Sequence, residues 1–198
     1  MSNVRRLGSR TRTEDIRLST ELDFQVCQLL DKLHAKYQAT VFGKIAQSLL
    51  AVTMSNLGWQ EIRNHLSEDA DIDVLGPQNR RLTFEVKTSK EPSIFVQPKD
   101  IACLNQRRVD GYEGFFAPMR VCAMARWVVV PSSSEIVRPG NLPFTIMELK
   151  DDRTMSESLN TQFNDVVKRF YETIDHLGLK GLLALMSRLG IESDYERY

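Results

Sequence analysis

Cysteine, histidine and long apolar runs are all scarce in this chain of 198 residues. Its three cysteines, Cys27, Cys103 and Cys122, lack the close spacing of a zinc or redox site. The odd number of cysteines and the lack of a signal-peptide pattern predict free thiols in a reducing cytoplasm. No apolar run approaches the roughly 20 residues of a membrane-spanning helix, so we expect a cytoplasmic protein without a membrane anchor.

Sequence patterns that identify several large protein classes are also absent. The chain has no Walker loop, no GxGxxG pattern and no internal repeat at a fixed period. His34, His65 and His176 lie far apart among residues expected to be helical. The Asp175-His176 pair has no serine or cysteine nucleophile motif beside it. These absences argue against a P-loop protein, a dinucleotide-dependent enzyme and a Ser-His or Cys-His hydrolase.

An excess of charge of one sign is a third absence, because 26 basic residues balance 26 acidic ones. The protein as a whole therefore exerts no net electrostatic attraction on nucleic acid. The distribution is uneven, however, because residues 1–19 contain five arginines against Glu14 and Asp15. These arginines are Arg5, Arg6, Arg10, Arg12 and Arg17. The segment is predicted to be a flexible arm that either contacts phosphates or keeps the terminus soluble.

What is present is the composition and apolar patterning of a soluble globular domain. Hydrophobic residues make up 42% of the chain and charged residues 26%, which is usual for such proteins. Apolar residues at steps of three and four predict helices over residues 20–37, 41–57, 99–108, 159–177 and 179–189. Gly58 is expected to end the second helix. The last helix is apolar around most of its circumference, which predicts packing within the chain or at a dimer interface.

Strands are predicted where β-branched and aromatic residues cluster between turn residues, over residues 59–63, 69–75, 81–89 and 127–130. Residues 115–123 form an ambiguous apolar segment, and Pro118 would confine such a strand to a sheet edge. We expect three parts: the basic arm at residues 1–19, a domain at residues 20–154 and a helical extension at residues 155–198. The extension is expected to pack on the core or at a dimer interface.

The most informative segment is the hairpin at residues 69–89, in which glycine, proline and asparagine supply the turn. Because side chains alternate along a strand, Asp71 and Asp73 share one face of the first strand. Glu85 and Lys87 share one face of the second strand, and the opposite face of both strands is apolar. Two or three carboxylates and one ammonium group thus converge, which is typical of a site for a hard divalent cation.

The residues of this hairpin match a known pattern. An Asp at the start of one strand and a Glu-x-Lys on the next resembles the PD-(D/E)XK nuclease superfamily, with Asp73 and Glu85-Val86-Lys87 in these places. The strand and helix that follow are similar to archaeal-type Holliday junction resolvases, and the resemblance covers roughly residues 42–131. It implies an α/β, restriction-endonuclease-like fold with an αβββαβ core, in which helices flank a central mixed sheet.

The resemblance also implies a metal-dependent deoxyribonuclease and a role for each residue. Asp73 and Glu85 would bind Mg²⁺, or Mn²⁺ as a substitute, together with the backbone carbonyl of Val86. Lys87 would lie over the attacking water and the scissile phosphate. Asp71 competes with Asp73 for the first ligand position, because hairpin geometry places Asp71 closer to Glu85. Asp73 is preferred because the apolar residues that follow it resemble the family pattern.

One position departs from the resolvase pattern. Resolvases usually carry a glutamate on the helix that precedes the strands, and Gln47 occupies that place here. A glutamine can bind a metal through its carbonyl oxygen but contributes no charge. Gln47 therefore argues against a second metal or against full activity. The alternatives are a one-metal site or the use of Glu68 or Asp69 instead.

Two classes of function follow from this pattern. The first is a Mg²⁺-dependent DNA endonuclease, either resolvase-like or of restriction or defence type, acting as a homodimer with symmetric sites. The second is a catalytically impaired module of the same fold that binds DNA or serves in an assembly. Candidate DNA contacts are Arg5, Arg6, Arg10, Arg12, Lys90 and Lys99, with Arg107, Arg108, Arg120 and Arg126 as further candidates at the border of the DNA-binding surface.

Overall fold

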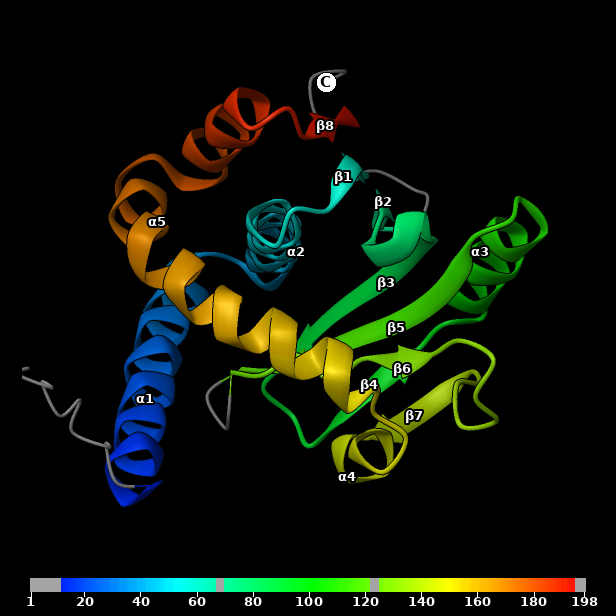
Figure 1. Cartoon of the computed structure of the whole chain (residues 1–198), viewed down its shortest axis with the longest axis horizontal. Coiled ribbons are helices and arrows are strands. Elements are labelled where there is room, and N and C mark those ends of the chain that lie inside the picture. Colours follow the sequence, from blue (N-terminus) through cyan, green and yellow to red (C-terminus); the bar gives the residue numbers. More distant parts are fainter. Residues whose placement is uncertain (1–11, 67–69, 122–124, 195–198) are drawn as a thin grey trace, which may run out of the picture.

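The computed structural model describes residues 12–66, 70–121 and 125–194, with side chains from residue 24 onward (Figure 1). The helices are α1 (Arg12–Lys36), α2 (Ala39–Asn56), α3 (Pro98–Val109), α4 (Phe144–Glu148) and α5 (Arg153–Arg188), with a 3-10 turn η1 at Pro77–Asn79. The strands are β1 (Gln60–Asn64), β2 (Ile72–Leu75), β3 (Arg81–Ser89), β4 (Ser93–Val96), β5 (Glu113–Arg120), β6 (Val130–Pro131), β7 (Gly140–Pro143) and β8 (Glu192–Ser193).

Six strands form one mixed sheet in the order β6-β5-β3-β2-β1-β8. Strand β2 pairs antiparallel with β1 and with β3, whereas β3 and β5 are parallel. Strands β4 and β7 form a separate two-stranded sheet. The order α2-β1-β2-β3-α3-β5 confirms the predicted αβββαβ core, and helices flank the central mixed sheet as expected.

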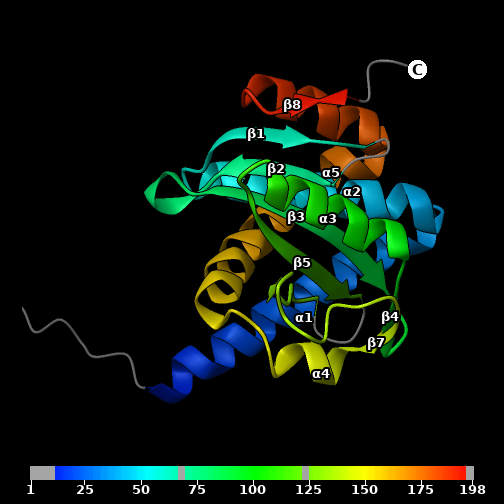
Figure 2. The same cartoon turned by 90° about the vertical axis from the view of Figure 1, so that its right-hand side faces the viewer.

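The two faces of the large sheet bury two different apolar cores. Strand β5 shows the division, because Phe115 and Ala117 belong to one core and Phe116 to the other. The larger core joins the sheet to α1, α2 and α5, and the smaller one joins it to β4, β7 and α4. Helix α3 lies on the side of the smaller core, across the sheet from α2 (Figure 1, Figure 2). The sheet thus separates the helix before the hairpin from the helix after it.

Helix α2 lies at the centre of the larger core and is buried along most of its length. Its buried side chains are mostly apolar, but they include the polar residues Gln47 and Ser48. The helix ends just before Gly58, whose φ of 80° lies in the left-handed region that glycine adopts without strain. The predicted stop at Gly58 is confirmed.

Helix α5 contains a single break at Gly178, whose φ is 61°. The sequence predicts two helices that meet at this position, and the break divides α5 accordingly. Beyond the break, Leu179, Leu182 and Met186 are buried in the larger core, so the apolar segment packs within the chain. Strand β8 then pairs in parallel with β1 and covers that edge of the sheet. The homodimer stays a prediction.

Helix α1 starts earlier than the sequence predicts. It begins at Arg12, so residues 12–19 are helical rather than part of a flexible arm. Residues 1–11 of the predicted arm lie outside the described residues. Within the ranges that the structure describes, no helix is long and apolar enough to cross a membrane.

Strand β5 is an inner strand even though it contains Pro118, contrary to the predicted edge position. The backbone carbonyl of Pro118 accepts a hydrogen bond of 2.9 Å from the N–H of Val128. In a strand, the N–H and the carbonyl of one residue point to the same side, so the N–H that Pro118 lacks would point toward Val128 and not toward β3. Pairing on the Val128 side is short, and the missing N–H therefore disrupts little. The predicted strand at residues 127–130 is correspondingly shorter, because regular pairing extends only over β6.

Candidate active site

The register of the hairpin decides which aspartate faces Glu85. Strands β2 and β3 pair antiparallel with Asp73 directly opposite Thr83. The same register, continued by two residues, places Asp71 opposite Glu85. The side chains on the other face of the hairpin are buried in the larger core with α2. They are Ile72, Val74, Phe84 and Val86. The polar face of the hairpin therefore lies on the α3 side of the sheet.

A backbone hydrogen bond fixes the carboxylate of Asp71 beside the Glu-x-Lys segment. The N–H of Val86 donates to Asp71 Oδ2 over 2.6 Å. Asp71 lies in the bend just before β2, and Val86 lies beyond the last residue of β3 that β2 pairs with. Because buried backbone N–H groups need acceptors, the Asp71 carboxylate replaces the missing strand partner here.

Lys87 lies between two carboxylates from different elements. Its Nζ is 2.6 Å from Glu85 Oε1 and 3.0 Å from Asp100 Oδ1. Asp100 is buried in the first turn of α3, where its second oxygen accepts a 2.8 Å hydrogen bond from the backbone N–H of Gln97. This is one half of a capping box at the start of α3. The box fixes Asp100, and Asp100 in turn fixes the direction of the Lys87 ammonium group.

Burial of these charges changes their protonation. Burial raises the pKa of Glu85 to about 8, and the neighbouring Asp71 carboxylate adds to the shift. Burial also raises the pKa of Asp71 to about 6. Burial acts on Lys87 in the lowering direction, but attraction to Glu85 and Asp100 outweighs it and raises the pKa of Lys87. Lys87 is therefore a fixed cation, whereas the Asp71–Glu85 pair retains a proton at neutral pH.

The chemistry of this donor set fits Mg²⁺. Burial raises the pKa of both Asp71 and Glu85, and a divalent cation that takes the place of the proton would stabilise the pair. In the described ranges, no three acidic, histidine or cysteine side chains come close enough to surround a metal on their own. Mg²⁺ needs no such cage, because it keeps several waters and is usually bound by one or two carboxylates plus substrate phosphates. Asp71 and Glu85, with the predicted carbonyl of Val86, would hold it.

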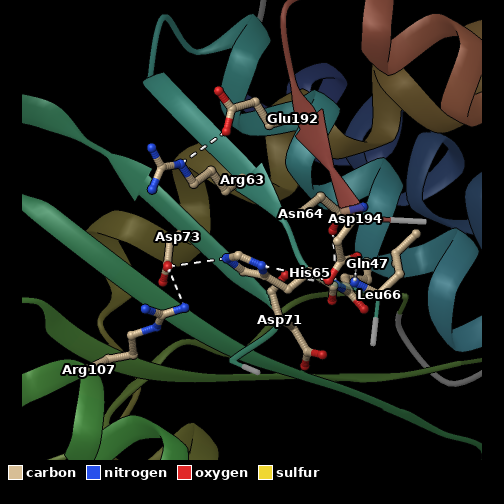
Figure 3. Close-up of polar contacts among 10 residues, drawn as sticks. All are labelled: Gln47, Arg63, Asn64, His65, Leu66, Asp71, Asp73, Arg107, Glu192 and Asp194. Atoms are coloured by element: carbon tan, nitrogen blue, oxygen red, sulfur yellow. Dashed lines mark hydrogen bonds and ion pairs between the residues drawn. The ribbon is translucent and has the colours of Figure 1, made fainter. Parts of the chain in front are cut away.

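The structure places Asp73 in a different contact group from the Glu-x-Lys motif (Figure 3). Arg107 Nη2 lies 3.0 Å from Asp73 Oδ2, and His65 Nε2 lies 3.3 Å from the same oxygen. Burial acts to raise the pKa of Asp73, but the hydrogen bond from His65 and the charge of Arg107 help to lower it overall. The carboxylate of Asp71 points away from this group in Figure 3. The geometry thus favours Asp71, the alternative that the sequence left open, as the partner of Glu85.

Gln47 acts as a hydrogen-bond donor beneath the hairpin. Its Nε2 donates to the backbone carbonyls of His65 at 2.7 Å and Asp71 at 2.8 Å. A third contact of 2.9 Å reaches Asn64 Oδ1. The buried amide thereby ties the end of β1 to the residue that precedes β2. A glutamate could not make these contacts because it has no N–H to donate, which explains the departure at this position in physical terms.

Gln47→Glu, which introduces the residue usual in resolvases, is expected to lower the free energy of unfolding by about 3 kcal/mol. The new carboxylate would be buried against three oxygen acceptors and would repel them. Urea unfolding followed by circular dichroism measures the change. Gln28→Glu on the exposed face of α1 is the matched control. A loss below about 1 kcal/mol would contradict this role of Gln47.

Comparison with known proteins adds information at the level of the fold. No protein-family model matches the sequence, and no curated protein matches it either. The fold resembles that of a Holliday junction resolvase in a solved structure, Hjc from the archaeal hyperthermophile Archaeoglobus fulgidus. The comparison with that structure has a TM-score of 0.48 and 18% sequence identity. The match covers 58% of this chain and 95% of that chain. The predicted resemblance is confirmed for the fold alone, and neither a site nor an activity follows from it.

The cations that the sequence proposes as DNA contacts are differently placed. Lys90 Nζ lies 2.8 Å from Asp31 Oδ1, so Lys90 links the end of β3 to α1. Lys99 is exposed in the first turn of α3, and Arg12 is the first residue of α1. Three N-terminal candidates and the two alternative acidic residues lie outside the described residues. These are Arg5, Arg6, Arg10, Glu68 and Asp69. Contacts of all these cations with DNA stay predictions.

Three contacts of the site do not follow from the sequence. Asp100 lies on the predicted helix, but its contact with Lys87 depends on how α3 packs. Arg107 is among the predicted DNA contacts, but the sequence does not indicate its pairing with Asp73. His65 is expected in helical surroundings, whereas it follows directly after β1. The capping pattern before α3 is the one local signal that could have pointed to Asp100.

Proposed function

We propose that the chain is a metal-dependent nuclease that hydrolyses phosphodiester bonds in DNA. The observation that carries this proposal is the meeting of Asp71, Glu85 and Lys87 on one face of the hairpin. Burial raises the pKa of both carboxyl groups there, and a fixed ammonium group lies 2.6 Å from Glu85. A surface salt bridge has no need of such burial, because pairing buried charges costs desolvation energy.

The residues of the site would divide the work of hydrolysis. Asp71 and Glu85 would hold Mg²⁺, which when bound supplies a water of lowered pKa and neutralises phosphate charge. The Lys87 ammonium would donate a hydrogen bond to a phosphate oxygen and stabilise the negative charge that develops there. Asp100 would keep this ammonium in place by accepting a hydrogen bond from another of its N–H groups. Junction and ordinary duplex DNA both remain possible substrates of such a centre.

Lys87→Ala is expected to reduce cleavage about 10³-fold, because no other cation lies within contact of Glu85 in the described structure. The measurement is cleavage of supercoiled plasmid, linear duplex and four-way-junction DNA with Mg²⁺, with Mn²⁺ or with EDTA. Lys180→Ala, an exposed position on α5 across the sheet, is the matched control and should cleave like the native protein.

The outcome of this experiment separates the candidate functions. Cleavage that requires the metal and is lost in Lys87→Ala supports the nuclease, and the preferred substrate separates a resolvase-like from a restriction-type role. Cleavage that is equal in Lys87→Ala and Lys180→Ala would show that the activity comes from elsewhere. DNA binding without cleavage of any substrate would favour the catalytically impaired module.

A further inference from the structure

Helix α3 presents two charged side chains to the hairpin, two helical turns apart. Asp100 contacts Lys87, and Arg107, seven residues later, contacts Asp73. Residues seven apart lie on the same face of a helix. Along the strand, the levels of Asp71 and Asp73 are separated by about 7 Å, because a strand rises about 3.3 Å per residue. The Arg107–Asp73 contact therefore lies directly beside the proposed metal site, two residues further along β2.

Arg107 is both held in place and open to solvent. Its guanidinium contacts Asp73 at 3.0 Å, and 23% of the side chain is exposed. The centre of the Tyr112 ring lies 5.8 Å from Cζ of Arg107 and 4.2 Å from Cζ of Arg81. A guanidinium carries five N–H donors in a rigid fork, so one edge can bind a carboxylate while another binds a phosphate.

Asp73 carries a buried carboxylate, and the energy of removing it from water makes it a poor means of stabilising the fold. It is 2% exposed, and the two groups that contact its Oδ2 are Arg107 and His65. Buried ion pairs generally contribute little net stability, because desolvation cancels most of the attraction. The arrangement does, however, hold a cation at one fixed point on the polar face of the hairpin. This is the property that a binding site for an anionic group requires.

We propose that Arg107, positioned by Asp73, binds a backbone phosphate of the nucleic acid next to the bond that is cleaved. The inference rests on the proposed function for the position of the scissile bond. The acidic side chains around Lys87 offset its attraction for a phosphodiester, so a cation one level away supplies attraction without occupying the metal site. The two aspartates of Asp71-Ile72-Asp73 then have separate tasks. Asp71 binds the metal, and Asp73 is a positioning residue for Arg107.

The test is the affinity for labelled duplex DNA in Mg²⁺ at several salt concentrations, measured by fluorescence anisotropy. All variants carry Lys87→Ala, so that the DNA stays intact. Arg107→Ala is expected to weaken binding about tenfold and to reduce the slope of log affinity against log salt by about one. Arg169→Ala is the matched control, because it removes the same charge from an exposed position on α5, across the sheet from α3.

Two further variants separate contact with DNA from a structural role. Arg107→Ala leaves Asp73 buried without its cation, whereas the double variant Arg107→Ala with Asp73→Asn removes both charges. The double variant should recover thermal stability but bind DNA as weakly as Arg107→Ala alone. Arg107→Lys, which keeps the charge but lacks the fork, should bind DNA with intermediate affinity.

Specific results would overturn the inference. They are equal losses of affinity in Arg107→Ala and Arg169→Ala, recovery of DNA binding in the double variant, or no DNA binding by the parent protein. Single-turnover cleavage by the protein with Lys87 intact is measured in parallel. If that protein cleaves DNA and Arg107→Ala binds normally, the phosphate site is wrong and the nuclease stands. If it binds DNA through Arg107 but cleaves nothing, the nuclease is wrong and the phosphate site stands.

Discussion

Glu85→Gln is expected to reduce the rate of DNA cleavage about 10³-fold or more, while making the metal-free protein more stable at pH 8. A glutamine keeps the shape of the side chain and one oxygen, but it removes the negative charge that holds the metal. It also removes the repulsion between Glu85 and Asp71, which burial makes large. Loss of activity and gain of stability in one variant is characteristic of a site built for a bound ion.

The pH dependence gives this prediction a defined sign. Burial raises the pKa of Glu85 from its ordinary value of 4.5 to about 8 in the folded protein. Between these values the folded state binds more protons than the unfolded state, so stability falls as the pH rises. Above the folded pKa the destabilisation is complete. Glu85→Gln has no proton to lose at this position, so its stability should depend less on pH over this window.

Thermal unfolding from pH 5 to pH 8 measures the effect, first in EDTA and then with Mg²⁺ or Mn²⁺. Cleavage is assayed on the same preparations. We expect Glu85→Gln to exceed the native protein at pH 8 by about 3 °C and to show no stabilisation by Mg²⁺ or Mn²⁺. Glu157→Gln, an exposed position on α5, should behave like the native protein in both assays. Retained cleavage by Glu85→Gln, or lower stability at pH 8, would refute the role assigned to Glu85.

Asp71→Asn is expected to lower the single-turnover cleavage rate about 10³-fold, whereas Asp73→Asn should lower it less than tenfold. Asparagine can still accept the hydrogen bond from the N–H of Val86, so Asp71→Asn should stay folded. Asp73→Asn should instead weaken DNA binding, because Arg107 loses the carboxylate that positions it.

The two variants are compared at saturating protein for the single-turnover rate, and by titrating protein into limiting labelled DNA for the affinity. The predicted pattern is a loss of rate in Asp71→Asn and a loss of affinity in Asp73→Asn. The opposite pattern would return the metal ligand to Asp73, as the resemblance to the nuclease superfamily suggests. It would also imply that bound metal changes the contacts of Asp73 with His65 and Arg107.

Local pattern was sufficient to predict the hairpin and its polar face, because alternation and turn residues act over a few positions. The end of α2 before Gly58 and the break in α5 at Gly178 could also be predicted from the sequence, since both glycines adopt a φ that other residues avoid. Hairpin geometry also places Asp71 closer to Glu85, and the observed register agrees with it. The preference for Asp73 comes instead from the family pattern of apolar residues after the aspartate, which carries no information on register.

Contacts between distant elements could not be predicted. Asp100 and Arg107 become part of the site only because α3 packs over β3 and β5, and this packing depends on the apolar surface of the smaller core. The position of β5 inside the sheet had a similar origin. Pro118 indicates an edge locally, but the parallel pairing with β3 satisfies the strand on its other side. Tertiary packing thus overrode a correct local preference.

The most direct test of the central claim is the rate at which saturating protein cleaves labelled DNA as Mg²⁺ is raised from zero. The predicted result is no cleavage in EDTA and a saturable rise with Mg²⁺ that Asp71→Asn, Glu85→Gln and Lys87→Ala all lack. Cleavage that persists in EDTA, or that is the same in these variants and the native protein, would contradict a metal centre at this hairpin.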